Sequence, residues 1–157
     1  MKLNPLIVAL KFHVLLLNGK VTINQKAPLS NAYPERFQPF LFVKIDTPQP
    51  TLAVRLLVKF KVHSLNIWQR FLLPVLSIPF FAGVPGFIDK TFLLNESENT
   101  FCGFYTWRSR EEAEIYTKSY PGKLMAWNAL DNALTMEISP IQLESPENHL
   151  KNSILTP

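Results

Sequence analysis

The sequence predicts an α+β fold in which helices cover one face of an antiparallel sheet. Three observations support this prediction. Residues 52–63 alternate between apolar and polar side chains, residues 87–94 and 100–107 are two strand-like segments separated by five turn-prone polar residues, and a helix start signal follows directly. Two strands joined by so short a loop form a hairpin. From residue 52 onward the order is β-α-β-β-α-β, the split-βαβ or ferredoxin-like arrangement.

The first strand, residues 52–63, has one apolar and one polar face. Alternation with a period of two is typical of a sheet whose faces have different surroundings. The apolar face is expected to lie under helices, whereas the polar face forms either a cavity wall or a solvated surface. The apolar face carries Val54, Leu56, Val58, Phe60 and Val62, and the polar face carries Arg55, Lys59, Lys61 and His63 with Ala53 and Leu57.

Residues 64–81 predict a helix that is broken by proline. Ser64 is a favourable N-cap, and an apolar stripe of Leu65, Trp68, Leu72 and Leu73 follows. Pro74 and Pro79 are expected to end or kink the helix, since proline removes a backbone donor and clashes with the preceding turn. Trp68 on this stripe is either a core residue or a ligand contact.

The second helix is expected over residues 110–119. Ser109 lies three residues before Glu112, the spacing of a capping box, and Ala113 and Tyr116 are expected to face inward. Pro121-Gly122 ends the helix. Residues 123–133, with Met125 and Trp127, favour one or two further helical turns. Residues 134–143 alternate as the last strand, and residues 144–157 form a polar tail.

The first 50 residues predict an N-terminal extension to the domain of residues 51–143. Six apolar residues fall on one face of a helix over residues 1–18, which either packs on the domain or lies on a membrane surface; packing is favoured. The alternative for residues 13–17 is a strand. Residues 19–50 hold five prolines around one apolar patch, residues 40–43, and predict an irregular arm with one short strand. The helical face consists of Leu3, Leu6, Ile7, Leu10, Val14 and Leu17.

Composition narrows the class of protein. Of the 157 residues, 47% are hydrophobic and 18% are charged, which suits one globular domain. The single cysteine, Cys102, excludes an internal disulfide and is expected to pack inside a strand. Residues 1–94 carry eleven Lys and Arg against three Asp and Glu, but the cations are scattered, so no nucleic-acid partner is predicted. The apolar run near the N-terminus is too short to span a bilayer, and a cytoplasmic location is expected.

The central segments resemble a known family. The strings PGFIDKTFLL, GFYTW and SREEAEIY are similar to those of the YdhR-like monooxygenase family, a branch of the dimeric α/β-barrel superfamily that also holds the antibiotic-biosynthesis monooxygenases. The likeness covers about residues 52–140. It implies a ferredoxin-like fold, a homodimer with facing sheets and a cavity beside the sheet, and it transfers no catalytic residue to this chain.

The aromatic strand at residues 100–107 also leads to a homodimer. Phe101, Tyr105 and Trp107 are expected on the face of the sheet that helices leave uncovered. Such an apolar patch would be too large for a soluble monomer, so a partner or a ligand is expected to bury it.

No sequence motif points to a cofactor. The chain has no phosphate-binding glycine loop, no dinucleotide fingerprint, no nucleophile elbow and no zinc motif, and its three histidines are dispersed, so no cofactor and no metal are predicted. His63 is the candidate base, and Arg55 is the candidate group that stabilises an anion. The predicted contacts to a hydrophobic or aromatic ligand are Trp68, Phe101, Tyr105, Trp107 and Tyr116.

Two functional hypotheses follow. The first is a small homodimeric enzyme of secondary metabolism acting on a hydrophobic or aromatic metabolite, as a cofactor-independent monooxygenase or, with the same pocket and base, a cyclase or isomerase. The second is a non-catalytic ligand-binding or assembly domain of the same fold. The resemblance and the aromatic inventory favour the first.

Overall fold

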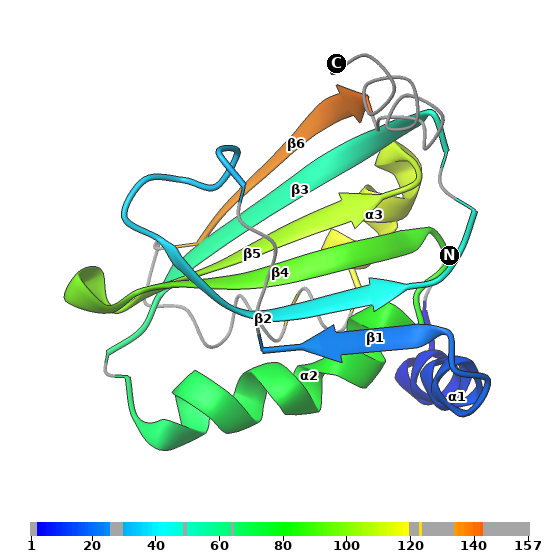
Figure 1. Ribbon diagram of the computed structural model, residues 1–157, viewed down its shortest axis with the longest axis horizontal. Coiled ribbons are helices and arrows are strands. Elements are labelled where there is room, and N and C mark those ends of the chain that lie inside the picture. Colours follow the sequence, from blue (N-terminus) through cyan, green and yellow to red (C-terminus); the bar gives the residue numbers. More distant parts are fainter. Residues whose placement is uncertain are drawn as a thin grey trace, which may run out of the picture.

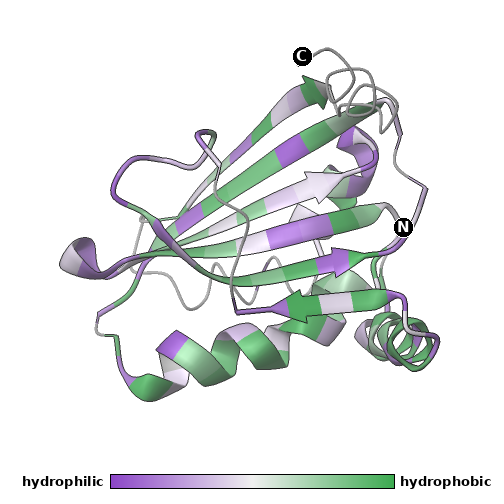
Figure 2. Cartoon of the chain, in the orientation of Figure 1, coloured by the Kyte–Doolittle hydropathy of each residue, from purple (hydrophilic) through white to green (hydrophobic). Residues whose placement is uncertain are grey.

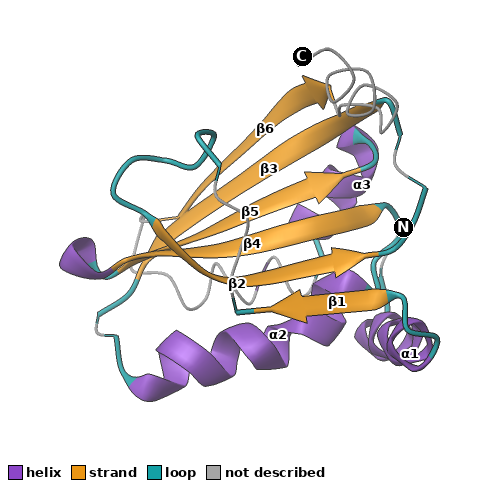
Figure 3. Cartoon of the chain, viewed as in Figure 1, coloured by secondary structure: helices purple, strands orange, loops and turns teal. Residues whose placement is uncertain are grey.

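A computed structural model of the chain describes residues 3–25, 30–48, 50–63, 65–119, 123 and 134–142. These residues form one six-stranded antiparallel sheet with helices gathered on one side (Figures 1 and 3). The strands are β1 (Val21–Asn24), β2 (Gln38–Ile45), β3 (Leu52–Lys61), β4 (Phe87–Asn95), β5 (Thr100–Trp107) and β6 (Leu134–Gln142). The helical segments are α1 (Pro5–Leu17), the π-helical turn η1 (Trp68–Leu72), α2 (Leu73–Ala82), the 3-10 turn η2 (Glu96–Glu98) and α3 (Arg110–Thr117).

The predicted fold class is confirmed. From β3 onward the elements follow the order β-α-β-β-α-β, and their strands lie side by side as β4-β5-β3-β6, the ferredoxin-like order. The predicted extension adds two strands to this sheet, because β2 pairs with the free edge of β4 and β1 pairs with β2. Part of the region expected to be irregular is therefore sheet.

The hairpin and the helix after it form as predicted. Between β4 and β5 the chain turns through η2, and Asn99 adopts a left-handed conformation with φ of 51°, which asparagine tolerates better than most residues. The Ser109 side chain accepts a hydrogen bond from the Glu112 backbone N–H at 3.3 Å. The Ser109 hydroxyl also donates to the Glu112 carboxylate at 3.0 Å. This cap starts α3 at Arg110.

The proline-rich helix is continuous through both prolines, contrary to the predicted break. Trp68–Leu72 forms a π turn, in which the Leu73 N–H donates to the Trp68 carbonyl, and α2 continues from Leu73 to Ala82. Pro74 is the second residue of α2, directly after the π turn, and Pro79 lies inside the helix. The predicted N-cap, Ser64, lies outside the described residues. Trp68 is 50% exposed and does not lie in the core.

Helix α1 packs on α2 through a different face from the predicted one. Val8 and Phe12 are buried, and Gly83 lets the two backbones approach closely. The helix is apolar on most sides (Figure 2), so the sequence pattern gave no reliable choice between faces. No helix in the described part of the chain is long and apolar enough to cross a membrane. The predicted inward residues Leu6, Ile7, Leu10, Val14 and Leu17 are exposed.

The face of β5 that carries Tyr105 and Trp107 is also corrected by the structure. In the β3–β5 register, Val54 pairs with Trp107, and Leu56 pairs with Tyr105. These aromatic residues therefore share the face of β3 that lies under the helices, as does Phe101, which pairs with Phe60. The helix-facing side predicted for β3 is confirmed by the complete burial of Leu56 and Val58.

The open face of the sheet is partly covered by the chain itself. Residues 30–37, which precede β2, cross in front of the sheet (Figure 1), and Tyr33 and Phe37 among them pack on Leu93, Cys102 and Phe104. The predicted packing of Cys102 inside a strand is confirmed, and burial raises the pKa of its thiol to about 12. A thiol with so high a pKa is a poor nucleophile at neutral pH.

Substitution of Gly83 tests the docking of α1. An alanine Cβ at this position would lie 1.9 Å from the Val8 carbonyl oxygen, so α1 must move. We expect Gly83→Ala to lower the free energy of unfolding by about 1–3 kcal/mol, the usual cost of overpacking. We also expect limited proteolysis to cut α1 earlier than in the parent protein.

Gly19→Ala is the matched control. Gly19 has φ of +65°, and an added Cβ would meet nothing within 4 Å, so only its left-handed backbone is strained. We expect a loss of about 1–2 kcal/mol without faster cleavage inside α1. Equal protection of α1 in both variants would contradict the close approach at Gly83.

Candidate functional site

A lysine lies in the middle of the helix-covered core. Lys90 is on the central part of β4, where it pairs with Val43 of β2 and Tyr105 of β5. It follows Asp89 directly, so the pleat directs these two side chains to opposite faces of the sheet. Asp89 is on the open face, where it accepts a hydrogen bond from Thr106. Lys90 therefore faces the helices.

Aromatic rings enclose the Lys90 ammonium. Its Nζ lies 3.6 Å from the ring centroid of Phe92, 4.2 Å from that of Phe81 and 4.4 Å from that of Tyr105. The residue is only 4% exposed. Phe81 comes from α2, Phe92 from β4 and Tyr105 from β5, so the enclosure joins the helix layer to two strands.

Burial changes the proton affinity of Lys90. Desolvation lowers the pKa of this amine well below its ordinary value of 10.5, because water is replaced by a medium that solvates the charge poorly. Attraction to each aromatic face contributes about 0.5–2 kcal/mol, against several kcal/mol for removing an ammonium from water. The lowered pKa makes the neutral amine available at lower pH than in an exposed lysine, and this form can accept a proton or act as a nucleophile.

Two tyrosines and a tryptophan extend the cluster toward α3. The hydroxyl groups of Tyr105 and Tyr116 are 3.0 Å apart and form a hydrogen bond. Burial raises the pKa of both phenols, so both stay protonated at neutral pH. The Trp107 ring lies 5.0 Å from that of Tyr116, and among the described residues its Nε1 has no hydrogen-bond partner. The cluster thus holds an amine with a lowered pKa, two hydroxyls and an N–H donor.

Gly103 makes room for the Tyr105 ring. A Cβ at position 103 would lie 2.5 Å from Cε2 of Tyr105, because the ring leans along β5 over the glycine. Glycine inside a strand often marks such a close approach. The position of the Tyr105 hydroxyl therefore depends on the missing side chain at residue 103.

The structure brings together only some of the site residues predicted from the sequence. Tyr105, Trp107 and Tyr116 share one cluster, whereas Phe101 packs in a neighbouring cluster with Val62 and Leu94. Trp68 lies on the outer surface of η1. The predicted substrate contacts therefore do not form a single site.

The predicted base and anion-stabilising residue do not lie at this cluster. His63 is exposed beyond the end of β3, and Arg55 is on the open face. Six residues of strand separate Arg55 from the end of β3 at Lys61, about 20 Å at 3.3 Å per residue, and His63 lies two residues beyond that end. They cannot act together on one small ligand, and the sheet separates Arg55 from Tyr105 and Trp107.

Arg55 belongs to a covered polar cluster on the open face. Its guanidinium lies 4.0 Å from the ring centroid of Phe104. The ring centroids of Phe104 and Tyr33, which precedes β2, are 5.0 Å apart. Burial lowers the pKa of Arg55 on β3, while burial raises the pKa of Asp89 on β4, which lies on the far side of β5. The Tyr33 hydroxyl also bonds Thr91 at 3.2 Å. This arrangement fixes the segment between β1 and β2 onto the sheet.

Lys90 was missed at the level of sequence, although a signal was present. It stands with Asp89 inside an otherwise apolar strand, and two adjacent charges on a strand point to opposite faces. When helices cover one face, one of the two charges must be buried beneath them. Within the described residues, no group of three or more histidine, cysteine or carboxylate side chains could hold a metal ion.

Replacement of Lys90 by methionine tests whether the buried amine costs stability. Methionine has a similar length and needs no proton or solvent, so we expect Lys90→Met to raise the free energy of unfolding at pH 7 by about 1–4 kcal/mol. Chemical denaturation measures this change. Lys59→Met, on the half-buried open face of β3, is the control and is expected to change stability by less than about 0.5 kcal/mol.

The pH dependence of the free energy of unfolding gives a second comparison between the parent protein and Lys90→Met. Unfolded Lys90 binds a proton up to a pH of about 10.5, whereas the folded amine loses it at lower pH. Because the unfolded state binds more protons in this window, the free energy of unfolding of the parent protein rises with pH. The difference in stability between Lys90→Met and the parent therefore becomes smaller toward pH 10.5. Tyr105 and Tyr116 lower stability above pH 10 in both proteins. A constant difference, or a destabilised Lys90→Met, would mean that the lysine is charged.

The chain matches no family model and no curated protein. A solved structure with a similar course is an uncharacterised ferredoxin-fold protein from Listeria monocytogenes 4b F2365, related to antibiotic biosynthesis monooxygenases. The likeness covers 85% of this chain and 88% of that chain, with 13% sequence identity and a TM-score of 0.43. The ferredoxin-like assignment rests on this chain's own strand order, β4-β5-β3-β6.

Proposed function

We propose that this chain is a small enzyme that oxidises an electron-rich, hydrophobic or aromatic metabolite without a cofactor, with Lys90 as its general base. The observation that supports the proposal is the burial of a lysine among three aromatic rings. A buried amine without a carboxylate partner among the described residues costs stability. Such groups with lowered pKa values are concentrated at functional sites.

The chemistry follows from the groups in the cluster. The acidic O–H or C–H bond of the substrate breaks, its proton moves to the neutral Lys90 amine, and the electron pair stays on the substrate. The anion then reduces dioxygen. One oxygen atom becomes a carbonyl oxygen on the substrate, and the other leaves as water with two hydrogens of the substrate.

The remaining residues of the cluster suit the anionic intermediate. Trp107 Nε1, beside the hydrogen-bonded Tyr105–Tyr116 hydroxyl pair, has no hydrogen-bond partner among the described residues and can donate to an oxyanion in a medium of low polarity. The surrounding Phe81 and Phe92 exclude water, which strengthens these hydrogen bonds and protects a reactive anion.

The homodimer stays a prediction. Phe101, Tyr105 and Trp107 lie under the helices and not on the open face, so they do not form an exposed apolar patch that a partner would bury. The open face is partly buried by Tyr33 and Phe37 of the same chain. A dimer of facing sheets would have to form beside this segment or displace it.

Dioxygen uptake tests the proposed enzyme. We expect the purified protein to accelerate oxygen consumption with at least one member of a panel of hydroquinones, naphthols and anthrones. Lys90→Met is expected to lower kcat/KM at least about 100-fold, the usual contribution of a general base. Lys59→Met, a lysine on the other face of the sheet, is expected to keep the parent activity.

The pH profile separates a base from a merely structural lysine. For the parent protein kcat/KM is expected to rise with pH as the Lys90 amine loses its proton, below the ordinary lysine value of 10.5. The residual rate of Lys90→Met is expected to lack this rise. Binding of panel compounds without any oxygen uptake would favour a non-catalytic ligand-binding domain, and full activity in Lys90→Met would exclude this lysine as the base.

A further inference from the structure

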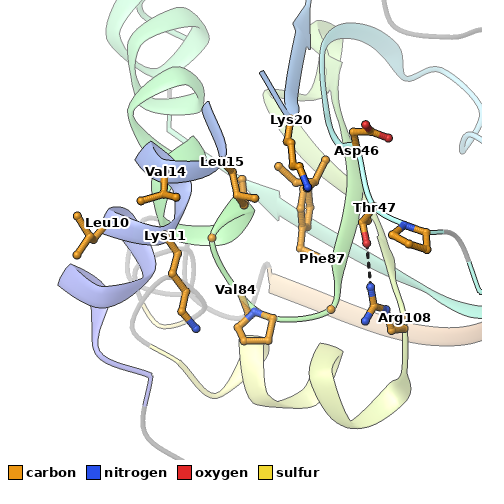
Figure 4. A pocket seen from close by; sticks show the side chains of 16 residues that line it. Leu10, Lys11, Val14, Leu15, Lys20, Asp46, Thr47, Val84, Phe87 and Arg108 are labelled. Carbon is orange, nitrogen blue, oxygen red and sulfur yellow. Dashed lines mark hydrogen bonds between the residues drawn. The ribbon is translucent and has the colours of Figure 1, made fainter. Parts of the chain in front are cut away.

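A separate pocket opens at one end of the helix layer. It has a volume of about 550 Å³ (Figure 4). It lies between α1, the turn from α2 to β4, and the residues next to the ends of β1, β2 and β5. Pockets of about 300–1,000 Å³ are the usual size for small-molecule sites. Lys90 is not among the residues that line it.

The walls of this pocket are mostly apolar. Helix α1 supplies one wall, and the turn after α2 supplies the floor, which Gly83 holds against the α1 backbone. Leu10 and Val14 are exposed toward solvent, so the wall presents apolar surface that no residue of the described chain covers fully. The apolar lining consists of Leu10, Val14, Leu15, Ile45, Ala82, Val84, Pro48, Pro85 and Phe87.

The charged residues of the pocket are mainly cationic. Lys11, Lys20 and Arg108 line it, against one carboxylate, Asp46. Figure 4 shows Lys11 on the α1 side and Lys20 and Arg108 on the opposite side, so the cations stand on both sides of the apolar floor. Arg108 donates a hydrogen bond to the Thr47 hydroxyl at 2.9 Å, which holds its guanidinium at the pocket.

We propose that this pocket binds an acidic amphiphile, a molecule with an apolar chain or ring system and one carboxylate or phosphate group. The apolar walls bury the body of such a ligand, and the excess of cations at the pocket attracts its acidic group. A neutral lipid would leave the cations without a partner, and a small inorganic anion would leave the walls in water. The acidic group belongs either to a free acid or to a lipid headgroup.

This site is independent of the proposed reaction at Lys90. Phe87 lines the pocket, Phe81 covers Lys90, and the centroids of these two rings are 5.2 Å apart. A layer of two rings therefore separates the pocket from the amine. Failure of either proposal leaves the other unaffected, because binding at the pocket is measured without turnover.

Calorimetric titration with decanoate and decanol tests the proposal. The parent protein is expected to bind decanoate at least about tenfold more tightly than decanol. Each exposed cation contributes about 1.5- to fivefold, so the triple variant Lys11→Gln/Lys20→Gln/Arg108→Gln is expected to lose most of this preference and to bind decanol as before. The matched control, Lys59→Gln/Lys61→Gln/Lys118→Gln, removes the same charge at positions that do not line the pocket.

A second variant tests the location of the ligand. Val14 is half-exposed, so Val14→Trp fills the pocket without disturbing the core and is expected to weaken binding of both decanoate and decanol at least about fivefold. A short-chain phosphatidylglycerol in the same titration distinguishes a lipid headgroup from a free acid, since the tighter ligand indicates the source. The proposal is wrong if neither acid binds, if decanol binds as tightly as the acids, or if both pocket variants bind like the parent.

Discussion

The packing of aromatic rings between the sheet and its helices is the interaction on which the rest of this structure depends. Phe81 of α2, Phe87 and Phe92 of β4 and Tyr105 of β5 contact one another, and Trp107 and Tyr116 continue the contacts to α3. Such rings bury large apolar areas, which fixes both helices on one face. Lys90 is the exception within this layer, and its burial opposes the stability that the rings supply.

The elements were predictable because each has a local cause. Three features depend only on short stretches of sequence, and all three form as expected: the alternation of β3, the polar loop of the hairpin and the Ser109 cap. The faces of β5 were not predictable in this way. The segment around Tyr33 covers the side of β5 opposite the helices, so seven of its eight residues are buried and no alternation remains. Only pairing with β3 decides which aromatic residues meet the helices.

The candidate site depended on that same long-range pairing. Tyr105 and Tyr116 were identified from residue type, but only the register between β4 and β5 shows that Lys90 lies beside Tyr105. The N-terminal region shows a similar limit. Helix α1 is apolar on most sides, and its docking face is set by Gly83, a residue about 70 positions away that admits the Val8 carbonyl. The pattern of side chains within α1 does not indicate this contact.

The two proposed sites share one structural layer but differ in how water reaches them. The pocket at α1 is open, so its cations stay hydrated and act by attraction alone, which is weak for each charge. Lys90 is enclosed, so the loss of water lowers the pKa of its amine below that of an ordinary lysine. Phe87 lines the pocket and packs against Phe81, whose ring covers Lys90. The Phe87 ring, which lines the binding pocket, therefore also supports the dry surroundings that lower the pKa of Lys90.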